Sequence, residues 1–223
     1  VVALGDALKA VQTAQPLPSK SVVITFDDAW RDIYEQGLPL LKKYDYPFTV
    51  FVNTDPVDQN NRHAMTWDML RDLKHHKGSL ANHTRDHAYL VRKPEYDDVW
   101  LSATLANIEH AQQRLEQELG HTPKWLAYPF GEYNNVLKQA LKERGYTAFG
   151  QQSGGVAAFS DWQALPRFPA AGRYSSLKTL KTKLASQPFP ANYAAFAEPV
   201  IRTDHGQNQQ PLLTVNLTQA QRL

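Results

Sequence analysis

Short apolar runs alternate with longer segments of helical periodicity along most of the chain. The runs at 22–26 and 48–52 are rich in β-branched and aromatic residues, which is typical of interior strands of a parallel sheet. Further strands are expected at 78–82, 125–128 and 146–150. Strands that alternate with helices in this way predict parallel βα units.

The predicted helices have recognisable ends. Thr66 can cap a helix over 68–74, because its side-chain oxygen can accept a hydrogen bond from the first turn. Leucine and isoleucine recur at helical spacing over 101–119 and predict the longest helix. Another helix is expected to begin at Asn134 or Asn135. Each of these helices fills an interval between two predicted strands.

The chain has 223 residues, which is long enough for one domain with a substantial core. We expect that domain over residues 1–187, with a helical segment at its N-terminus. From 188 the sequence becomes rich in Pro, Gln and Asn, and it includes an apolar run at 212–217. Residues 188–223 are therefore predicted to form a C-terminal extension, either an added strand or the start of a second module.

Composition excludes several classes of function. Lys and Arg number 24 and Asp and Glu 22, so the formal charge is +2, and no basic block supports nucleic-acid binding. The chain has no cysteine, which excludes disulfides, thiolate metal ligands and cysteine catalysis. No segment approaches the roughly 20 apolar residues that cross a bilayer. The chain starts at Val1 rather than Met, which indicates a processed or trimmed N-terminus.

Polar residues follow two of the predicted strands. Asp27 and Asp28 come directly after the first strand, and His83 and His87 follow the third. Two imidazoles four residues apart can converge on one cation, and active sites of α/β barrels lie at the carboxyl ends of the strands. The alternative is a pair of surface histidines, with the aspartates serving a turn and a helix N-terminus. The combined pattern favours a divalent metal site with a base beside it.

Three motifs carry a resemblance to a known family. They are Thr-Phe-Asp-Asp at 25–28, His-Thr-Arg-Asp-His at 83–87 and Tyr-Pro-Phe-Gly at 128–131. In this order and spacing the chain resembles the NodB-like polysaccharide deacetylases, the family 4 carbohydrate esterases, over residues 20–170. The resemblance implies an α/β fold, a distorted (β/α) barrel of about seven parallel strands, with a short extra C-terminal β segment.

The resemblance also implies roles for individual residues. It makes Asp27 the catalytic base, and it makes Asp28, His83 and His87 the ligands of a divalent metal. The metal would be Zn²⁺, with Co²⁺ or Ni²⁺ as alternatives. The backbone N–H of Phe130 would bind the oxyanion of the tetrahedral intermediate.

Several residues depart from the pattern of the family. Ala127 stands where the family commonly has an arginine that orients the base. Arg167 is the candidate substitute, because it is expected to emerge from a later strand on the same rim; the alternative is an ordinary surface arginine. Ala29 replaces the usual glycine after the two aspartates, so the local backbone must accept a Cβ. The histidine acid of the family has no clear match, and only His205 lies near its place in the order of motifs.

Five residues around the motifs are expected to contact the substrate: Trp30, Thr84, Tyr128, Pro129 and Tyr133. Trp30 directly follows the aspartates and is a candidate wall of a groove. The resemblance also gives Thr84 a hydrogen bond that stabilises the loop between the histidines.

The leading hypothesis is a metal-dependent hydrolase that removes N-acetyl groups from polysaccharide or oligosaccharide containing N-acetylglucosamine. The departures resemble the branch that acts on poly-β-1,6-N-acetylglucosamine. One alternative is a carbohydrate-binding pseudoenzyme that retains the metal site, and another is an enzyme acting on a small amide or an O-acetyl ester. We expect an N-acetylated glycan as partner and a location in the periplasm, outside the cell or at the cell envelope. The sequence leaves the oligomeric state open.

Overall fold

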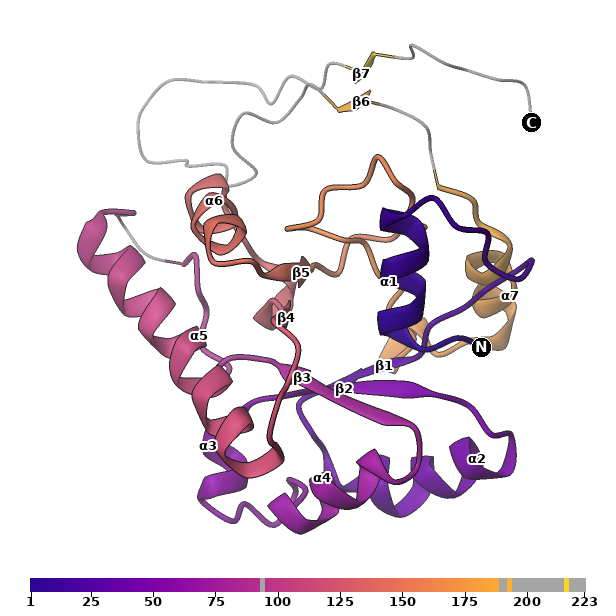
Figure 1. Cartoon of the computed structure of the whole chain (residues 1–223), viewed down its shortest axis with the longest axis horizontal. Helices are drawn as coiled ribbons and strands as arrows, with labels where there is room; N and C mark the ends of the chain where they lie inside the picture. Colours follow the sequence, from indigo (N-terminus) through magenta and orange to yellow (C-terminus); the bar gives the residue numbers. More distant parts are fainter. Residues whose placement is uncertain (93–94, 189–191, 194–214, 217–223) are drawn as a thin grey trace.

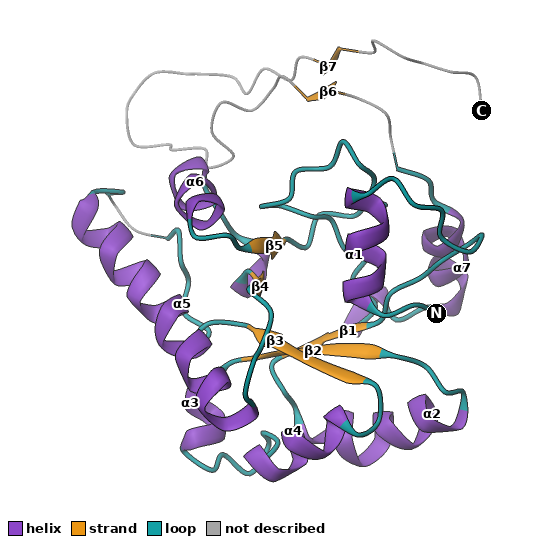
Figure 2. Cartoon of the chain, viewed as in Figure 1, coloured by secondary structure: helices purple, strands orange, loops and turns teal. Residues whose placement is uncertain are grey.

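The computed structural model describes residues 1–92, 95–188, 192–193 and 215–216 (Figure 1). Its centre is a five-stranded parallel sheet in which the strands follow one another in chain order. The strands are β1 (Thr25–Asp27), β2 (Phe48–Val52), β3 (Gly78–Asn82), β4 (Trp125–Ala127) and β5 (Thr147–Phe149). The parallel βα arrangement predicted from the alternation of elements is confirmed (Figure 2).

The sheet is an open half-barrel with β1 and β5 at its edges. The described part of the chain has five parallel strands in it, against the seven or so expected. A parallel bridge from Phe149 to Leu165 continues the pairing beyond β5. The first strand is shorter than the predicted run at 22–26 and starts later, and Val22 O accepts a 2.9 Å hydrogen bond from Val2 N instead of pairing in the sheet. Ladder pairing with β2 starts at Thr25.

Helix α1 (Leu4–Gln12) covers the inner side of the half-barrel. Figure 1 shows it beside β1, in the opening between that strand and the chain that follows β5. Its buried residues Leu4 and Leu8 pack with inward-facing side chains from four strands and the bridge, namely Phe51, Ala81, Ala127, Phe149 and Leu165. The N-terminal helical segment is therefore part of the core of the domain.

Other helices cover the outer side of the sheet in two apolar layers. One layer lies between β1–β3 and helices α2 (Leu38–Lys43) and α4 (Trp67–Lys74). The other lies between β4–β5 and helices α5 (Asp98–Leu119) and α6 (Asn135–Glu143). Burial of these apolar faces on both sides explains why the interior strand β2 is buried at all five positions.

Helix caps explain where these helices begin. The Thr66 hydroxyl accepts a hydrogen bond from Met69 N at 3.3 Å, which confirms the predicted cap. Asn134 caps α6 in the same way, through Leu137 N at 2.8 Å. Helix α5 begins before the predicted residue 101, because Asp97 caps it from the position preceding Asp98.

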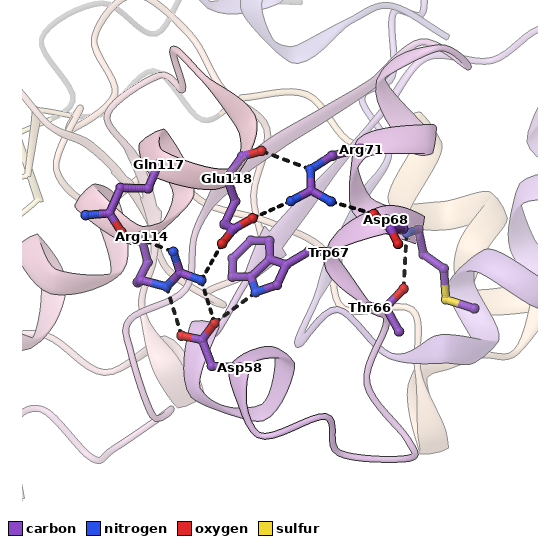
Figure 3. Close-up of polar contacts among 9 residues, drawn as sticks. Asp58, Thr66, Trp67, Asp68, Arg71, Arg114, Gln117 and Glu118 are labelled. Carbon is purple, nitrogen blue, oxygen red and sulfur yellow. Dashed lines mark hydrogen bonds and ion pairs between the residues drawn. The ribbon is translucent and has the colours of Figure 1, made fainter.

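A network of charged side chains ties α3 (Thr54–Asp58), α4 and α5 together (Figure 3). Arg114 of α5 donates to both carboxylate oxygens of Asp58, at 3.0 and 2.7 Å, and Trp67 Nε1 donates to the same carboxylate at 2.8 Å. The hydrogen bonds from Arg114 hold the pKa of Asp58 below its ordinary range. Glu118 accepts from Arg114 at 2.6 Å and also from Arg71, so the network spans three helices.

The C-terminal part of the chain is described in pieces. Helix α7 (Leu177–Ala185) precedes a short antiparallel pair, β6 (Asn192–Tyr193) with β7 (Val215–Asn216). Most of the predicted extension at 188–223, including His205, lies outside the described residues. Within the described part, none of the helices has the length and apolar character needed to span a membrane.

Replacement of Arg114 by methionine tests the network of Figure 3. Arg114→Met keeps the aliphatic stem but leaves Asp58 and Glu118 without their shared donor. Charge-assisted hydrogen bonds of this kind contribute about 2 kcal/mol, so the free energy of unfolding should fall by about that amount. Urea denaturation measures it. The control Lys77→Met, which removes an exposed pair with Asp45, should change stability by less than about 0.5 kcal/mol. Equal losses of unfolding free energy in the two variants would show that the network stabilises the fold no more than an exposed ion pair does.

Candidate active site

The functional side chains lie at the carboxyl ends of the parallel strands. β1 ends in Asp27, and β2 and β3 are followed directly by Asn53 and His83. The parallel register pairs Asp27 with Phe51 and Val52 with Asn82, so the three strands end at one rim. The predicted convergence of the two motifs therefore follows from the pairing of the strands.

Asp28, His83 and His87 converge on one point. Asp28 Oδ1 lies 3.4 Å from Nε2 of each histidine, and the three ligand atoms lie within 4.8 Å of one another. Nδ1 of the buried His83 lies 2.8 Å from the carbonyl oxygen of Ala127. A carbonyl can only accept, so Nδ1 carries the proton and the Nε2 lone pair faces Asp28.

The electrostatics of this cluster suit a divalent cation. Burial lowers the pKa of His87, and the neighbouring His83 lowers it further, which favours the neutral, metal-binding imidazole. Burial raises the pKa of Asp28, but when His83 is doubly protonated its hydrogen bond and charge, together with His87 and Trp30, bring that pKa below its ordinary value. One carboxylate and two imidazoles form a donor set typical of Zn²⁺. The residues present fit such an ion.

The backbone around the cluster is left-handed at five residues that are not glycine. They are Asp28 (φ 73°), Ala29 (φ 54°), Thr84 (φ 68°), His87 (φ 56°) and Phe130 (φ 58°). This conformation is uncommon for residues with a Cβ, and such residues cluster at functional sites. The backbone at Ala29 thus has the conformation that glycine favours, although an alanine occupies it.

Hydrogen bonds hold the loop between the two histidines in this shape. Thr84 N donates to Asn82 Oδ1 at 2.7 Å, and His87 N donates to the Thr84 hydroxyl at 3.1 Å. Asn82 is itself anchored to α5, because its side-chain amide donates to Ile108 O at 2.8 Å. Thr84 is completely buried, so its hydroxyl serves the loop and lies out of reach of a substrate.

Arg167 lies against Asp27 in a two-point ion pair. Its Nη1 and Nη2 donate to the two carboxylate oxygens at 2.7 and 2.9 Å. Nε of the same guanidinium donates to Gly150 O at 3.0 Å, which fixes the arginine to the chain after β5. Ala127, at the position where the family commonly has an arginine, is buried in the inner core. Two parallel bonds to one guanidinium restrict rotation of the carboxylate and hold Asp27 in this orientation.

A cavity of about 270 Å³ opens beside the cluster. Asp28, His87, Trp30 and Phe130 line it, together with Asn53, Pro56, Asn61 and Ala64. Trp30 is 51% exposed, and its indole N–H donates to Asp28 Oδ2 at 3.1 Å. Phe130 packs edge-on against His87, with ring centres 4.5 Å apart. Two aromatic side chains therefore flank the opening between the metal-site residues and solvent.

Four of the five expected substrate contacts lie outside the lining of this cavity, the buried Thr84 among them. Tyr128 is completely buried, and its hydroxyl donates to Gln163 O at 2.8 Å. Pro129 is buried too, and the partly buried Tyr133 packs against the apolar layer that includes Tyr128 and residues of α6. Core packing thus takes the Tyr128 and Pro129 side chains away from any surface that a substrate can reach.

Other residues at the site had not been singled out from the sequence. Asn53 lines the cavity, and its position directly after a strand, like that of Asp28, is a signal that could have identified it. Tyr89 stacks on Phe130 with ring centres 3.9 Å apart, and the Arg92 guanidinium lies 3.9 Å from the Tyr89 ring. No local pattern marks these last two residues, because their position depends on the loop that follows His87.

Comparison with known proteins agrees with this geometry. The chain belongs to the polysaccharide deacetylase family, whose model matches residues 14–149. It is 29% identical over 157 residues to the poly-β-1,6-N-acetyl-D-glucosamine N-deacetylase of Staphylococcus epidermidis, covering 67% of this chain and 54% of that protein. The enzyme of the same name from Escherichia coli is 24% identical over 206 residues, covering 74% of this chain and 30% of that protein.

Solved structures show the same fold. The Streptococcus pyogenes deacetylase PplD, determined in complex with acetate, superposes with a TM-score of 0.73 at 22% identity, covering 82% of this chain and 78% of that one. The resemblance to NodB-like deacetylases is confirmed by the family match, and the half-barrel by the superposition. The chain spans 54% and 30% of the lengths of the two curated relatives above.

Removal of one histidine tests the metal site. His83→Ala should weaken Zn²⁺ binding by about 100-fold or more, because it removes a buried ligand whose orientation is fixed by Ala127 O. Isothermal titration with ZnCl₂ measures the affinity. The matched control His75→Ala changes an exposed histidine at the end of α4 and should bind as the unmodified protein does. Unchanged affinity in His83→Ala would mean that Zn²⁺ binds elsewhere.

Proposed function

We propose that this protein is a metal-dependent hydrolase that removes N-acetyl groups from polysaccharide or oligosaccharide containing N-acetylglucosamine. The observation that carries the proposal is the carboxylate of Asp27, held by Arg167 next to the cluster of Asp28, His83 and His87. Family membership and the names of the two curated relatives support the reaction and favour a poly-β-1,6-linked glycan. The catalytic domain would comprise residues 1–187.

Asp28, His83 and His87 would hold the cation, with Zn²⁺ as the preferred ion. When bound, the cation would polarise the acetyl carbonyl and lower the pKa of a water molecule. The proton on His83 Nδ1 is shared with Ala127 O, which keeps the ring oriented for ligation.

Asp27 would act as the general base. The guanidinium of Arg167 occupies one lone pair on each carboxylate oxygen, and each oxygen retains a second lone pair. The base therefore keeps an acceptor position while its orientation is fixed. Arg167 serves as a positioning residue, and Asp27 accepts the proton of the water that attacks the acetyl carbon.

The backbone N–H of Phe130 would stabilise the oxyanion. Among the described backbone hydrogen bonds, none uses this N–H as donor. The turn that presents it needs glycine at the next position, because Gly131 has φ 71° and a Cβ there would lie 2.7 Å from Gln151 Cβ. A donor fixed in this way requires little reorganisation as negative charge develops on the carbonyl oxygen.

The leaving amine needs a proton when the C–N bond breaks. We assign this step to Asp27, which already carries the proton taken from water; His205 lies outside the described residues. Asp27 returns that proton to the sugar nitrogen, the C–N bond breaks, and the acetyl group leaves as acetic acid. The second proton of the water then passes from acetic acid to the free amine or to solvent, which leaves acetate.

Aromatic side chains support a glycan substrate. Trp30 and Phe130 flank the cavity, and Tyr89 extends the surface of Phe130 outward, with 44% of its residue area exposed. Stacked, exposed rings offer flat apolar surfaces to the faces of sugar rings. A polymer of this kind places the enzyme in the periplasm, outside the cell or at the envelope.

Substitution of Asp27 by asparagine tests the role of the base independently of metal binding. Acetate release from N-acetylglucosamine oligomers, linked β-1,4 or β-1,6, should fall by about 100-fold or more because no group can take the proton. Zn²⁺ binding should persist, since Asp27 is outside the ligand cluster. The exposed control Asp32→Asn should keep full activity.

Two outcomes would contradict the proposal. Acetate release that survives in Asp27→Asn would remove the proposed base. An unmodified protein that binds Zn²⁺ and oligomer but releases acetate from neither amides nor esters would be a carbohydrate-binding module instead.

Variants of Arg167 test its role as a positioning residue. Arg167→Met should lower kcat by about 10–100-fold and leave KM nearly unchanged, because the base loses its orientation while the cavity lining is unaltered. Arg167→Lys should recover only part of the activity, since an ammonium cannot reproduce the two parallel bonds. Steady-state kinetics measure both parameters. A change confined to KM would instead identify Arg167 as a substrate-binding residue.

A further inference from the structure

A second cavity, of about 470 Å³, lies next to the metal-site cavity. Ala88 and Tyr89, which directly follow the candidate ligand His87, form part of its lining. Tyr89 stacks on Phe130 with ring centres 3.9 Å apart, and Phe130 lines the metal-site cavity. The two cavities therefore meet at one stacked pair of rings. The volume of the second cavity is within the range of small-molecule sites, about 300 to 1,000 Å³.

The floor of the second cavity holds a buried hydroxyl with no partner. Trp100 and Thr104 lie one turn apart on α5, and each has only 7% of its area exposed. The Trp100 indole N–H donates to Leu90 O at 2.7 Å, but the Thr104 hydroxyl makes no hydrogen bond within the described part of the chain. The unpaired side-chain atoms that are closed to solvent belong to other residues, so a molecule in the cavity can reach this hydroxyl. Buried polar groups are normally paired, which indicates a ligand here.

The rim of the second cavity is negatively charged. Glu95 and Asp97, both exposed, line it. Asp97 Oδ1 accepts from Trp100 N at 2.7 Å, and neither carboxylate forms an ion pair within the described residues. Lys, Arg and His are absent from its described lining residues, and the neighbouring Arg92 is paired with Glu132, to which its Nε donates at 2.9 Å. The two carboxylates are thus available to a cationic ligand.

We propose that the second cavity binds a glucosamine unit of the same glycan strand, one from which the acetyl group has already been removed. The protonated amine would pair with Glu95 and Asp97, and a sugar hydroxyl would bond to Thr104. This role deepens the proposed function, on which it rests, because the product of one reaction becomes a ligand for the next. A strand bound in this way presents a further acetylated unit to the metal-site cavity.

Charge distinguishes the deacetylated unit from the acetylated one. Removal of the acetyl group leaves a primary amine, which is cationic when protonated, whereas an acetamide is neutral. Hydrogen bonds between an ammonium and a carboxylate are about twice as strong as those between neutral groups. The cavity therefore favours strands that are partly deacetylated, and new amines should appear at a fixed distance from existing ones.

Binding is tested with the β-1,6-linked pentamer of glucosamine, which has no acetyl group to release. In isothermal titration, the double variant Glu95→Gln, Asp97→Asn should bind it about tenfold or more weakly than the unmodified protein, because charge-assisted contacts are lost. Asparagine is as good an N-cap as aspartate, so α5 keeps its start. Thr104→Val removes only the buried hydroxyl and should weaken binding about fivefold.

The matched control is Asp98→Asn. Asp98 is an exposed carboxylate in the first turn of α5 that lies outside the cavity lining, so this variant should bind the pentamer as the unmodified protein does. Thermal unfolding checks that the variants fold, and the double variant changes exposed side chains only. Equal binding of the pentamer by the unmodified protein and the double variant would overturn the proposal.

The positions of the amines in the product give a second readout, which a general loss of stability would not change. The unmodified protein, loaded with Zn²⁺, should deacetylate a long N-acetylated oligomer so that amines recur at a fixed spacing, as located by tandem mass spectrometry. The double variant should remove the first acetyl group at the unmodified rate and place later amines at random. Random placement by the unmodified protein would contradict the proposed role of the cavity.

Titration also separates this role from the proposed function. If the unmodified protein releases acetate from none of the oligomers, the proposed function fails, and the affinities for the acetylated and deacetylated pentamers decide the role of the cavity. A preference of about tenfold for the deacetylated pentamer that is lost in the double variant would support it. Equal affinities, or no binding of either pentamer, would overturn it, whether or not acetate is released.

Discussion

The parallel register of β1, β2 and β3 is the constraint on which the site depends. It pairs Asp27 with Phe51 and Val52 with Asn82, so the residues that follow three strands meet at one rim. Successive side chains of a strand point to opposite faces, so a shift of one residue would turn the inward-facing side chains outward. The apolar layers on both sides of the sheet oppose such a shift. Core packing and the geometry of the candidate metal centre are thus consequences of the same pairing.

The residues with left-handed backbone around the Asp28, His83 and His87 cluster are held in place by the packed structure around them. Each such residue with a Cβ is unfavourable by about 1 kcal/mol or more, and it persists only where neighbouring structure holds it. The carbonyl of Ala29 accepts from Met65 N at 2.9 Å, and His87 N is bound by the Thr84 hydroxyl. These bonds leave Asp28 and His87 little freedom to move apart. A site held in this way is organised before any ligand arrives.

The ion pair between Asp27 and Arg167 links the first strand to the chain beyond the last one. The two residues are 140 positions apart, and the bridge from Phe149 to Leu165 brings them together. The segment after β5 therefore completes the site, although its described residues add a single bridge to the five-stranded sheet. Ala127 stands where the family commonly has the arginine that orients the base, and its small side chain packs in the inner core. In this protein Arg167 makes the contact with Asp27.

The sequence by itself determined the secondary-structure elements and the features that depend on residues close together in the chain. Periodicity marked the strands and helices, side-chain oxygens such as that of Thr66 marked helix starts, and the spacing of the aspartates and histidines indicated a metal site. The sequence offered Arg167 as a candidate to orient Asp27 and left an ordinary surface arginine as the alternative, and tertiary structure decided between the two. It alone decided that Tyr128 is buried and that Asn53 Oδ1 lacks a partner within the described residues. The physical reason is the range of the interactions: propensities and caps act within a few residues, whereas burial and pairing depend on how distant strands are placed.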